Sequence, residues 1–429
     1  MLSAFAQAFR TPDLRRKLLF TLGIIAIYRV GTFIPAPGVS YSNVQQCLAA
    51  AGTGDLLGMV NLFSGGALLQ LSVFALGIMP YITASIIVQL MRVVIPRFED
   101  LHKEGQSGQS KLTQYTRYLT IFLAVLQSSV IVTVANTALF QGCAVLPIPD
   151  NSPLNLLITI TTMTAGTGLI MWLGELITER GVGNGMSLLI FTSIVASFPS
   201  ALGAIAGGTN GALNLIVVIA LLLLVTLLVV FVEQSQRRIP VQYAKRMVGR
   251  RLYGGSSTYI PIKINMANVI PVIFASSLLA LPTLAAQFGD QTSGWVQWLI
   301  ANVADPTAPL YIAVYGLLIL FFAFFYTSIT FNPDEVADNM KRYGGFIPGI
   351  RAGRPTAEYL QYVITRITTA GAIYLTVVAL LPTIVMAQMN ITQLVLGGTS
   401  IIIVAGVGLQ TVKEIDSQLQ QRHYEGFLR

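Results

Sequence analysis

Residues 213–232 read LNLIVVIALLLLVTLLVVFV, an uninterrupted run without a charged side chain. A bilayer core of roughly 30 Å needs about 20 apolar residues in a helix, so this stretch is long enough to span a membrane. Further stretches of the same kind lie on both sides of it. The predicted spans are Leu18–Phe33, Leu71–Val94, Tyr118–Leu139, Leu154–Ile177, Met186–Ala206, Leu213–Val232, Val269–Ala286, Leu310–Phe331, Ile367–Met386 and Ile391–Leu409.

The composition of the whole chain agrees with a membrane protein. Of the 429 residues, 54% are hydrophobic and 10% are charged, whereas soluble proteins are about one quarter charged. This excludes a soluble multidomain protein and a disordered one, and two Cys residues exclude a disulfide scaffold. The first span follows Arg15, Arg16 and Lys17 like a signal peptide, but Pro35 and Pro37 stand where a cleavage site is expected. We therefore interpret it as a true span.

The basic residues predict the side of the membrane that each loop occupies. Of the 26 Lys and Arg residues, all except Arg29 and Arg366 fall in the two termini and in alternate loops, and the loops between these hold none. Cytoplasmic loops carry the excess of Lys and Arg. We therefore expect an even number of spans with both termini in the cytoplasm.

The predicted spans contain almost no ionisable side chains, although coupled transporters usually keep a carboxylate or His near mid-membrane. With two His residues, no H-E-x-x-H and no phosphate-binding loop, the sequence contains no recognisable catalytic centre. We expect no catalytic residue, no metal site and no cofactor. Cys47 and Cys143 both fall in loops on the predicted oxidising side, but their spacing sets no distance, so we expect two unpaired thiols.

A shorter apolar stretch, DLLGMVNLFSGGALLQ at Asp55–Gln70, lies between the first two spans. It is too short to cross a bilayer, and Gly65-Gly66 offers a flexible break. A short helix that enters the protein and returns would fit, because irregular backbone is tolerated where protein or water surrounds it. The residues alone favour an amphipathic helix on the outer surface.

Ordered motifs along almost the whole chain resemble the SecY family of protein-conducting channels. They are NLFSGGAL at Asn61–Leu68, FALGIMPYITASII at Phe74–Ile87, QYTRY at Gln114–Tyr118, MWLGELITERGVGNG at Met171–Gly185, QRRIPVQYAKR at Gln236–Arg246, IKINMANVIPVIFASS at Ile262–Ser277, FNPDEVADN at Phe331–Asn339 and GGTS at Gly397–Ser400. The resemblance implies an all-α polytopic fold, with ten transmembrane helices in two inverted pseudo-symmetric halves and a re-entrant plug helix.

The resemblance also implies a division of the chain. The expected parts are a cytoplasmic N-terminus (1–17), an N-terminal half with spans one to five (18–206) and the plug near 56–70, a C-terminal half with spans six to ten (207–411) and cytoplasmic loops at 233–266 and 332–360, and a cytoplasmic tail (412–429).

The resemblance implies a ring of bulky apolar side chains at the waist of the pore, closed by the plug. An apolar ring suits a substrate of any sequence, because it offers no preferred hydrogen bond and resists wetting when empty. Taken alone, any one of these Ile residues would be assigned to lipid or core packing. The ring positions are Ile78, Ile82, Met186, Ile190, Ile273 and Ile403, and the plug positions are Asn61, Leu62, Phe63, Ser64, Gly65, Gly66, Ala67 and Leu68.

A lateral gate between spans two and three on one side and seven and eight on the other is implied by the same resemblance. Hydrophobic segments gain free energy by leaving a wet pore for lipid. Small and polar residues permit close but reversible helix contact, although they equally serve as ordinary interhelical contacts. The gate positions are Thr83, Ser85, Gln89, Gln127, Ser128, Ser276 and Ser277.

Two long basic loops complete the set of candidate sites. The first, Glu233–Lys263, alternates apolar and polar residues around Gly254-Gly255, which predicts a β-hairpin. In the SecY family these loops bind the motor ATPase SecA or the ribosome, and we select Arg250, Arg251 and Arg351 because arginine pairs with carboxylates and phosphates. The simpler interpretation is membrane topology plus attraction to anionic lipids.

The resemblance implies a protein-conducting channel subunit in the bacterial plasma membrane, without enzymatic activity of its own. The expected partners are SecE, SecG, SecA, the ribosome, preprotein signal sequences and anionic lipids. A small-solute secondary transporter is the alternative, which the missing mid-membrane charge opposes. An intramembrane enzyme lacks a visible catalytic pair.

Overall fold

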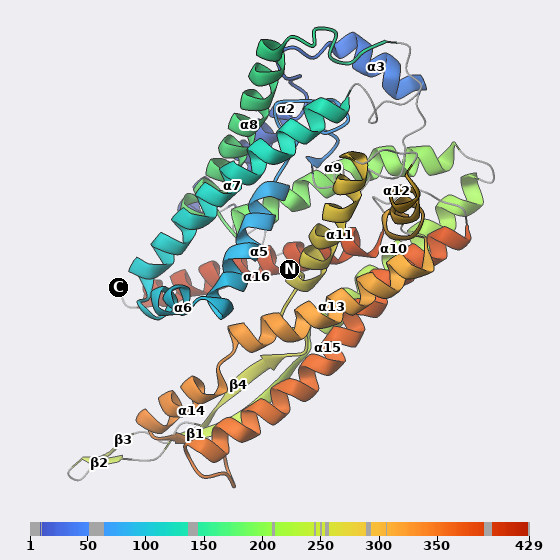
Figure 1. Cartoon of the computed structure of the whole chain (residues 1–429). Helices are drawn as coiled ribbons and strands as arrows, with labels where there is room; N and C mark the ends of the chain where they lie inside the picture. Colours follow the sequence, from blue (N-terminus) through green and yellow to red (C-terminus); the bar gives the residue numbers. More distant parts are fainter. Residues whose placement is uncertain are drawn as a thin grey trace.

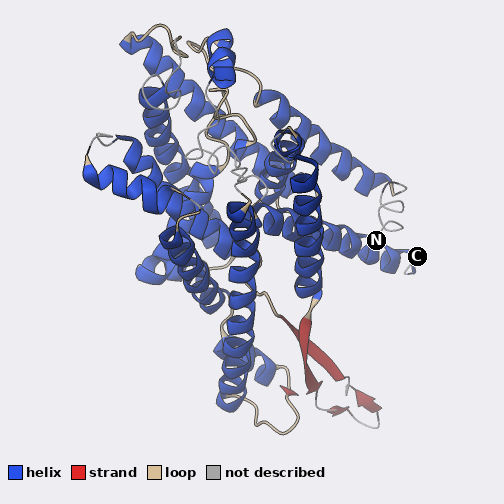
Figure 2. Cartoon of the chain, turned by 90° about the vertical axis from the view of Figure 1, so that its right-hand side faces the viewer, coloured by secondary structure: helices blue, strands red, loops and turns tan. Residues whose placement is uncertain are grey.

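The computed structural model describes the chain except for residues 1–8, 10, 51–63, 136–144, 208–210, 244–245, 249–250, 254–256, 289–292, 306, 390–396 and 428–429. It is a bundle of long helices with a small sheet at one end (Figures 1 and 2). Each predicted span contains a helix. These helices are α2 (Pro12–Gly31), α5 (Met79–Val94), α7 (Gln106–Val134), α8 (Pro153–Arg180), α9 (Gly185–Ala206), α10 (Gly211–Gln234), α11 (Ile270–Phe288), α13 (Pro309–Thr330), α15 (Arg354–Gln388) and α16 (Gly398–Phe427).

Helix length and apolar composition identify the chain as a multi-pass membrane protein. Among the described residues, seven helices are long and apolar enough to cross a membrane: α7, α8, α9, α10, α13, α15 and α16. Helix α5 meets the criterion together with α6 (Pro96–Lys103), from which a 97° bend separates it. The described apolar part of α11 is shorter (Ile270–Leu279), and α2 opens with charged residues.

The second span begins later than the sequence predicts. The chain forms turns before Met79, so the first residues of the predicted span Leu71–Val94 are not helical. Here the backbone bonds to the strand-like stretch after α2, with Val73 N–H donating to Ile34 O at 2.9 Å. On the other side a Cβ at Gly166 of α8 would lie only 2.0 Å from Val73 O. The turns therefore fit tightly between the end of α2 and α8.

The prediction of two unpaired thiols is wrong. Cys47 lies on α3 (Tyr41–Ala50) and is disulfide-bonded, while Cys143 falls outside the described residues. The reason is a contact that sequence spacing does not reveal: Asn43 Nδ2 donates to Leu146 O at 2.8 Å. This bond brings the loop before α8 against α3.

The predicted β-hairpin is present and is joined by the second basic loop. Strands β1 (Gln236–Tyr243) and β4 (Ser257–Lys263) pair antiparallel, and β5 (Gly345–Phe346) adds to the other edge of β1. At the tip, β2 (Arg246–Val248) pairs with β3 (Arg251–Tyr253). The sheet shares an apolar core with α14 (Pro333–Arg342) and the first turns of α15. The two loops thus form one folded module that projects from the bundle (Figure 2).

Helices formed by residues before 207 contact helices formed by residues after 207 at two interfaces. At one interface α5 and α7 contact α11, and at the other α9 contacts α10 and α16. Short outer helices, α12 (Gly294–Leu299) and the π-helix η3 (Ile300–Ala304), pack against α11. The position of α11 therefore decides how far the two parts of the chain stand apart at α5 and α7.

Leu360→Ala tests whether the loop module has a core of its own. Leu360 of α15 is fully buried in that core, and loss of a buried leucine side chain typically costs about 2–5 kcal/mol. Amide exchange in β1 should accelerate, as measured by hydrogen exchange of the purified protein. The neighbouring exposed change Gln361→Ala is the control; equal exchange in both variants would contradict the shared core.

Candidate functional site

Five of the six predicted ring residues belong to one apolar cluster of buried side chains. Ile82 comes from α5, Met186 and Ile190 from α9, and Ile403 from α16, while Ile78 immediately precedes α5. Ile273 of α11 packs against the cluster and is only partly buried. The exposed fraction is 1% for Ile78 and 0% for Ile403. The structure therefore brings side chains from both parts of the chain into one apolar cluster.

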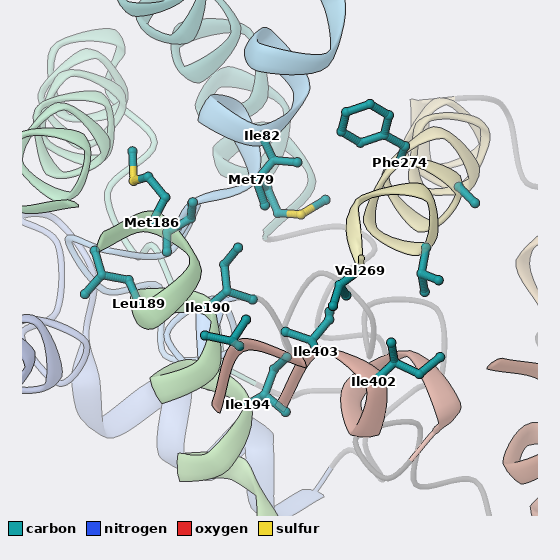
Figure 3. Packing of buried hydrophobic residues seen from close by; sticks show 14 of the residues in the cluster. Met79, Ile82, Met186, Leu189, Ile190, Ile194, Val269, Phe274, Ile402 and Ile403 are labelled. Carbon is teal, nitrogen blue, oxygen red and sulfur yellow. The ribbon is translucent and has the colours of Figure 1, made fainter. Parts of the chain in front are cut away.

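Figure 3 shows further members of the cluster that the sequence analysis did not select. Ile190 and Ile403 lie beside Val269, which immediately precedes α11, and Met79 lies beside Ile82. Ile194 follows Ile190 by one helical turn, so the i, i+4 rule would have identified it. The same spacing argument applies to Val269, four residues before Ile273, and to Met79, three residues before Ile82. The labelled residues missed by the sequence analysis are Met79, Leu189, Ile194, Val269, Phe274 and Ile402.

The start of α9 fixes the ring residues Met186 and Ile190. Asn184 is the N-cap of α9, and its Oδ1 accepts hydrogen bonds from the Met186 N–H at 3.1 Å and the Ser187 N–H at 3.3 Å. Such a cap satisfies backbone donors that a helix start leaves unpaired. Further along α9, Ser193 Oγ lies 2.6 Å from Tyr28 Oη of α2. The contact with Tyr28 sets the rotation of α9 against α2, and hence which of its side chains reach the cluster.

The second half of the predicted plug segment lies against the same cluster. Ser64, Ala67 and Leu68 are buried, and Ala67 belongs to the cluster. After Ser64 this stretch consists of turns, with positive φ at Gly65 and Gly66. Asn61, Leu62 and Phe63 lie outside the described residues, so the plug helix itself stays a prediction.

Arg29 contacts this segment, although the sequence analysis noted it only as one of two basic residues outside the termini and loops. Its Nη1 donates to the Gly65 carbonyl oxygen at 2.8 Å, and its guanidinium lies 5.0 Å from the centre of the Phe33 ring. A charge-assisted hydrogen bond is stronger than a neutral one. The sequence signal is a basic residue within a predicted span, apart from the loops that carry the other Lys and Arg residues.

Comparison with known proteins identifies the family. The SecY family model matches residues 72–412. The chain belongs to the SecY family. The protein translocase subunit SecY of Streptomyces scabiei is 63% identical over 440 residues, and that of Mycobacterium bovis is 57% identical over 442 residues; each alignment covers 100% of both chains.

Solved structures share the fold of this SecY-family chain at low identity. A solved protein conducting channel superposes with a TM-score of 0.61 and 19% identity, covering 93% of this chain and 91% of the other. Sec61 in a canine ribosome-channel complex from the endoplasmic reticulum gives a TM-score of 0.61 and 18% identity with the same coverage. The expected SecY-type fold is confirmed.

The predicted gate residues of the SecY-family chain fall into two groups. Thr83 Oγ1 donates to Met79 O at 3.0 Å and Ser276 Oγ to Ile273 O at 2.9 Å, each within its own helix. Ser277 is buried on α11, and its hydroxyl has no hydrogen-bond partner among the described residues. Neither of these two hydrogen bonds joins α5 to α11. Ser85, Gln89 and Gln127 are half-buried.

The remaining predicted gate residue, Ser128 of α7, contacts α8. Its hydroxyl lies 3.2 Å from Thr164 Oγ1 of α8, so it contributes to packing between α7 and α8. The sequence did not predict this contact, because both faces of α7 carry polar residues.

Two of the three predicted docking residues lie at the loop module. Arg351 is exposed before α15, and its carbonyl oxygen accepts a hydrogen bond from Thr356 Oγ1 at 2.8 Å, which fixes the loop. Arg251 begins β3 at the tip of the hairpin, and Arg250 lies outside the described residues. The described part of the chain contains no group of three or more His, Cys, Asp or Glu residues that could hold a metal ion.

Arg29→Met tests the anchoring of the plug segment. The change removes the donor to Gly65 O, and a lost hydrogen bond to a charged group should raise amide exchange at Leu68 by about tenfold. Exchange is measured by mass spectrometry on the protein in detergent or nanodiscs. Arg16→Met, exposed on the same helix, is the control. An unchanged exchange rate at Leu68 would mean that Arg29 does not hold this segment.

Proposed function

We propose that this SecY-family chain is the channel subunit of the general secretion translocase of the bacterial plasma membrane. It passes unfolded preproteins between its two halves and releases hydrophobic segments sideways into lipid. The observation that carries the proposal is the single apolar cluster to which α5, α9, α11 and α16 all contribute. The cluster lies where the residues before and after 207 meet, which is where a path through the molecule would have to open.

The chemistry of the cluster suits a polypeptide substrate. Ile78, Ile190 and Ile403 have no donor or acceptor on their side chains, so a passing chain of any sequence forms no specific bond with them. Dispersion and burial are non-directional, so aliphatic side chains can close on one another when idle and around an extended chain when open. A narrow apolar constriction also opposes wetting, which limits ion leak.

The contact between α5 and α11 is the proposed lateral gate, with Thr83, Ser85, Gln89, Gln127, Ser276 and Ser277 at or near it. The hydroxyls of Thr83 and Ser276 bond within their own helices, so separating the helices need not break them. Hydrogen bonds between membrane helices average only about 1 kcal/mol. Ser128 stays in this predicted set, and its hydroxyl also lies 3.2 Å from Thr164 Oγ1 of α8.

The loop module is the proposed docking surface, with Arg250, Arg251 and Arg351 as its contact residues. The Streptomyces and Mycobacterium relatives are translocase subunits, and a Sec61 relative occurs in a ribosome-channel complex. We infer that SecE and SecG assemble with the chain, and that SecA or the ribosome docks on the module. Signal sequences enter at the gate, and anionic lipids attract the remaining basic residues on the cytoplasmic side, where both termini lie. No catalytic role is proposed.

Reconstitution tests the proposed function directly. Vesicles containing the chain with SecE and SecG should take up a preprotein when SecA and ATP are present. The same vesicles without the chain are the control. Uptake of a small solute without preprotein movement would instead favour a secondary transporter.

A triple substitution tests the apolar ring. Replacing Ile78, Ile190 and Ile403 together with Ser should raise resting ion conductance in planar bilayers by about tenfold or more, because hydroxyls lower the dewetting barrier. The matched control changes three exposed residues to Ser: Ile27, Ile216 and Ile373, which are 56%, 68% and 54% exposed. Equal conductance in the two variants would remove the ring from the ion barrier.

A further inference from the structure

A buried polar pair joins the end of α10 to the segment that leads into α11. Glu233 is 8% exposed and Asn265 is 3% exposed. Asn265 Nδ2 donates to the Glu233 carboxylate. A buried carboxylate is costly unless it is hydrogen-bonded, and breaking such a pair leaves an uncompensated polar group. The two residues are separated by the whole hairpin in sequence, so the bond ties together the two ends of that hairpin.

The same Asn265 amide controls the turn that starts α11. Its Nδ2 also donates to Asn268 O at 2.9 Å, so one amide group spans Glu233 and Asn268. Asn268 has a φ of 51°, in the left-handed region that a residue other than glycine adopts only when its surroundings favour it. The first backbone bond of the following turn runs from Ile270 N–H to Ala267 O at 3.3 Å. The Glu233–Asn265 pair thus sets where α11 begins.

Three further contacts hold the base of the hairpin next to Asn265. The Ile264 N–H donates to Ser235 O at 3.2 Å and closes the base of the hairpin. A Cβ at Gly371 of α15 would lie 2.5 Å from Ile264 O, so only glycine lets α15 approach this closely. Lys413 Nζ of α16 donates to the Glu233 carbonyl oxygen at 3.4 Å. The base of the hairpin cannot shift without moving Asn265.

We propose that Glu233 and Asn265 are positioning residues that transmit displacement of the hairpin module to α11. The proposal rests on the proposed function, in which partners load the module and α11 forms one side of the gate. Residues 264–269 contain no helix, and the Asn265 amide bonds this connection both to Glu233 and to the turn before α11. With these two bonds, the hairpin and the first turn of α11 move as one body.

Spin labels measure this coupling independently of transport. One label is placed at Thr258 on β4 and one at Leu278 on α11, both exposed, after both native cysteines are replaced by serine. In the complex with SecE and SecG, the distance distribution between the labels should be narrow. Glu233→Ala should broaden it, while Glu233→Gln, whose amide oxygen can still accept from Asn265, should leave it narrow. Glu358→Ala, an exposed carboxylate change on the module, is the control.

The transport arm uses the same variants in SecA-driven preprotein uptake. Glu233→Ala should slow uptake by about tenfold, as expected for loss of a buried hydrogen bond of about 1.4 kcal/mol, and Glu233→Gln should restore it. Where Glu233→Ala does not accumulate, Asn265→Ser takes its place. An unchanged distance distribution overturns the coupling, even if uptake falls. Absence of uptake by the wild-type complex would count against the proposed function and leaves the spin-label result to decide the coupling.

Discussion

Where α5, α9, α11 and α16 meet, aliphatic side chains from distant parts of the chain contact one another through dispersion and burial alone. This contact is non-directional, and it can separate without stranding a buried donor or acceptor. The rest of the structure is arranged around that property. Directional hydrogen bonds hold these helices at positions away from the cluster. The apolar contact therefore needs no hydrogen bond of its own.

The directional bonds lie to the sides of the apolar contact. Tyr28 and Ser193 join α2 to α9 at 2.6 Å, and Tyr315 Oη lies 2.5 Å from Thr399 Oγ1, joining α13 to α16. Each pair links helices within one half of the proposed division. On α5 and α11, by contrast, the hydroxyls of Thr83 and Ser276 each bond within their own helix. Side-chain hydrogen bonds thus hold each half together, and the contact between the halves is weaker. A channel that opens both along its pore and sideways into lipid requires this arrangement.

How much of this could be predicted differs from element to element. Long apolar runs such as Leu213–Val232 determine helices because a bilayer accepts little else, and the hairpin followed from alternation around Gly254-Gly255. The ring residues came from motif resemblance, since an isolated Ile in a span carries no information about which face it occupies. The late start of α5 at Met79 could not be predicted, because the turns before it are as apolar as a helix. The disulfide at Cys47 and the Glu233–Asn265 bond depend on contacts between residues far apart in sequence, which no local pattern encodes.

The central claim is that a translocating chain passes through the apolar cluster. A photoreactive amino acid placed at Ile190 within the reconstituted complex, with a preprotein arrested part-way, tests it most directly. The account predicts strong crosslinks from Ile190 to the arrested chain and none from the exposed residue Ile216 on α10. Crosslinks absent at Ile190 while the preprotein is demonstrably arrested in the membrane would place the path elsewhere and contradict the account.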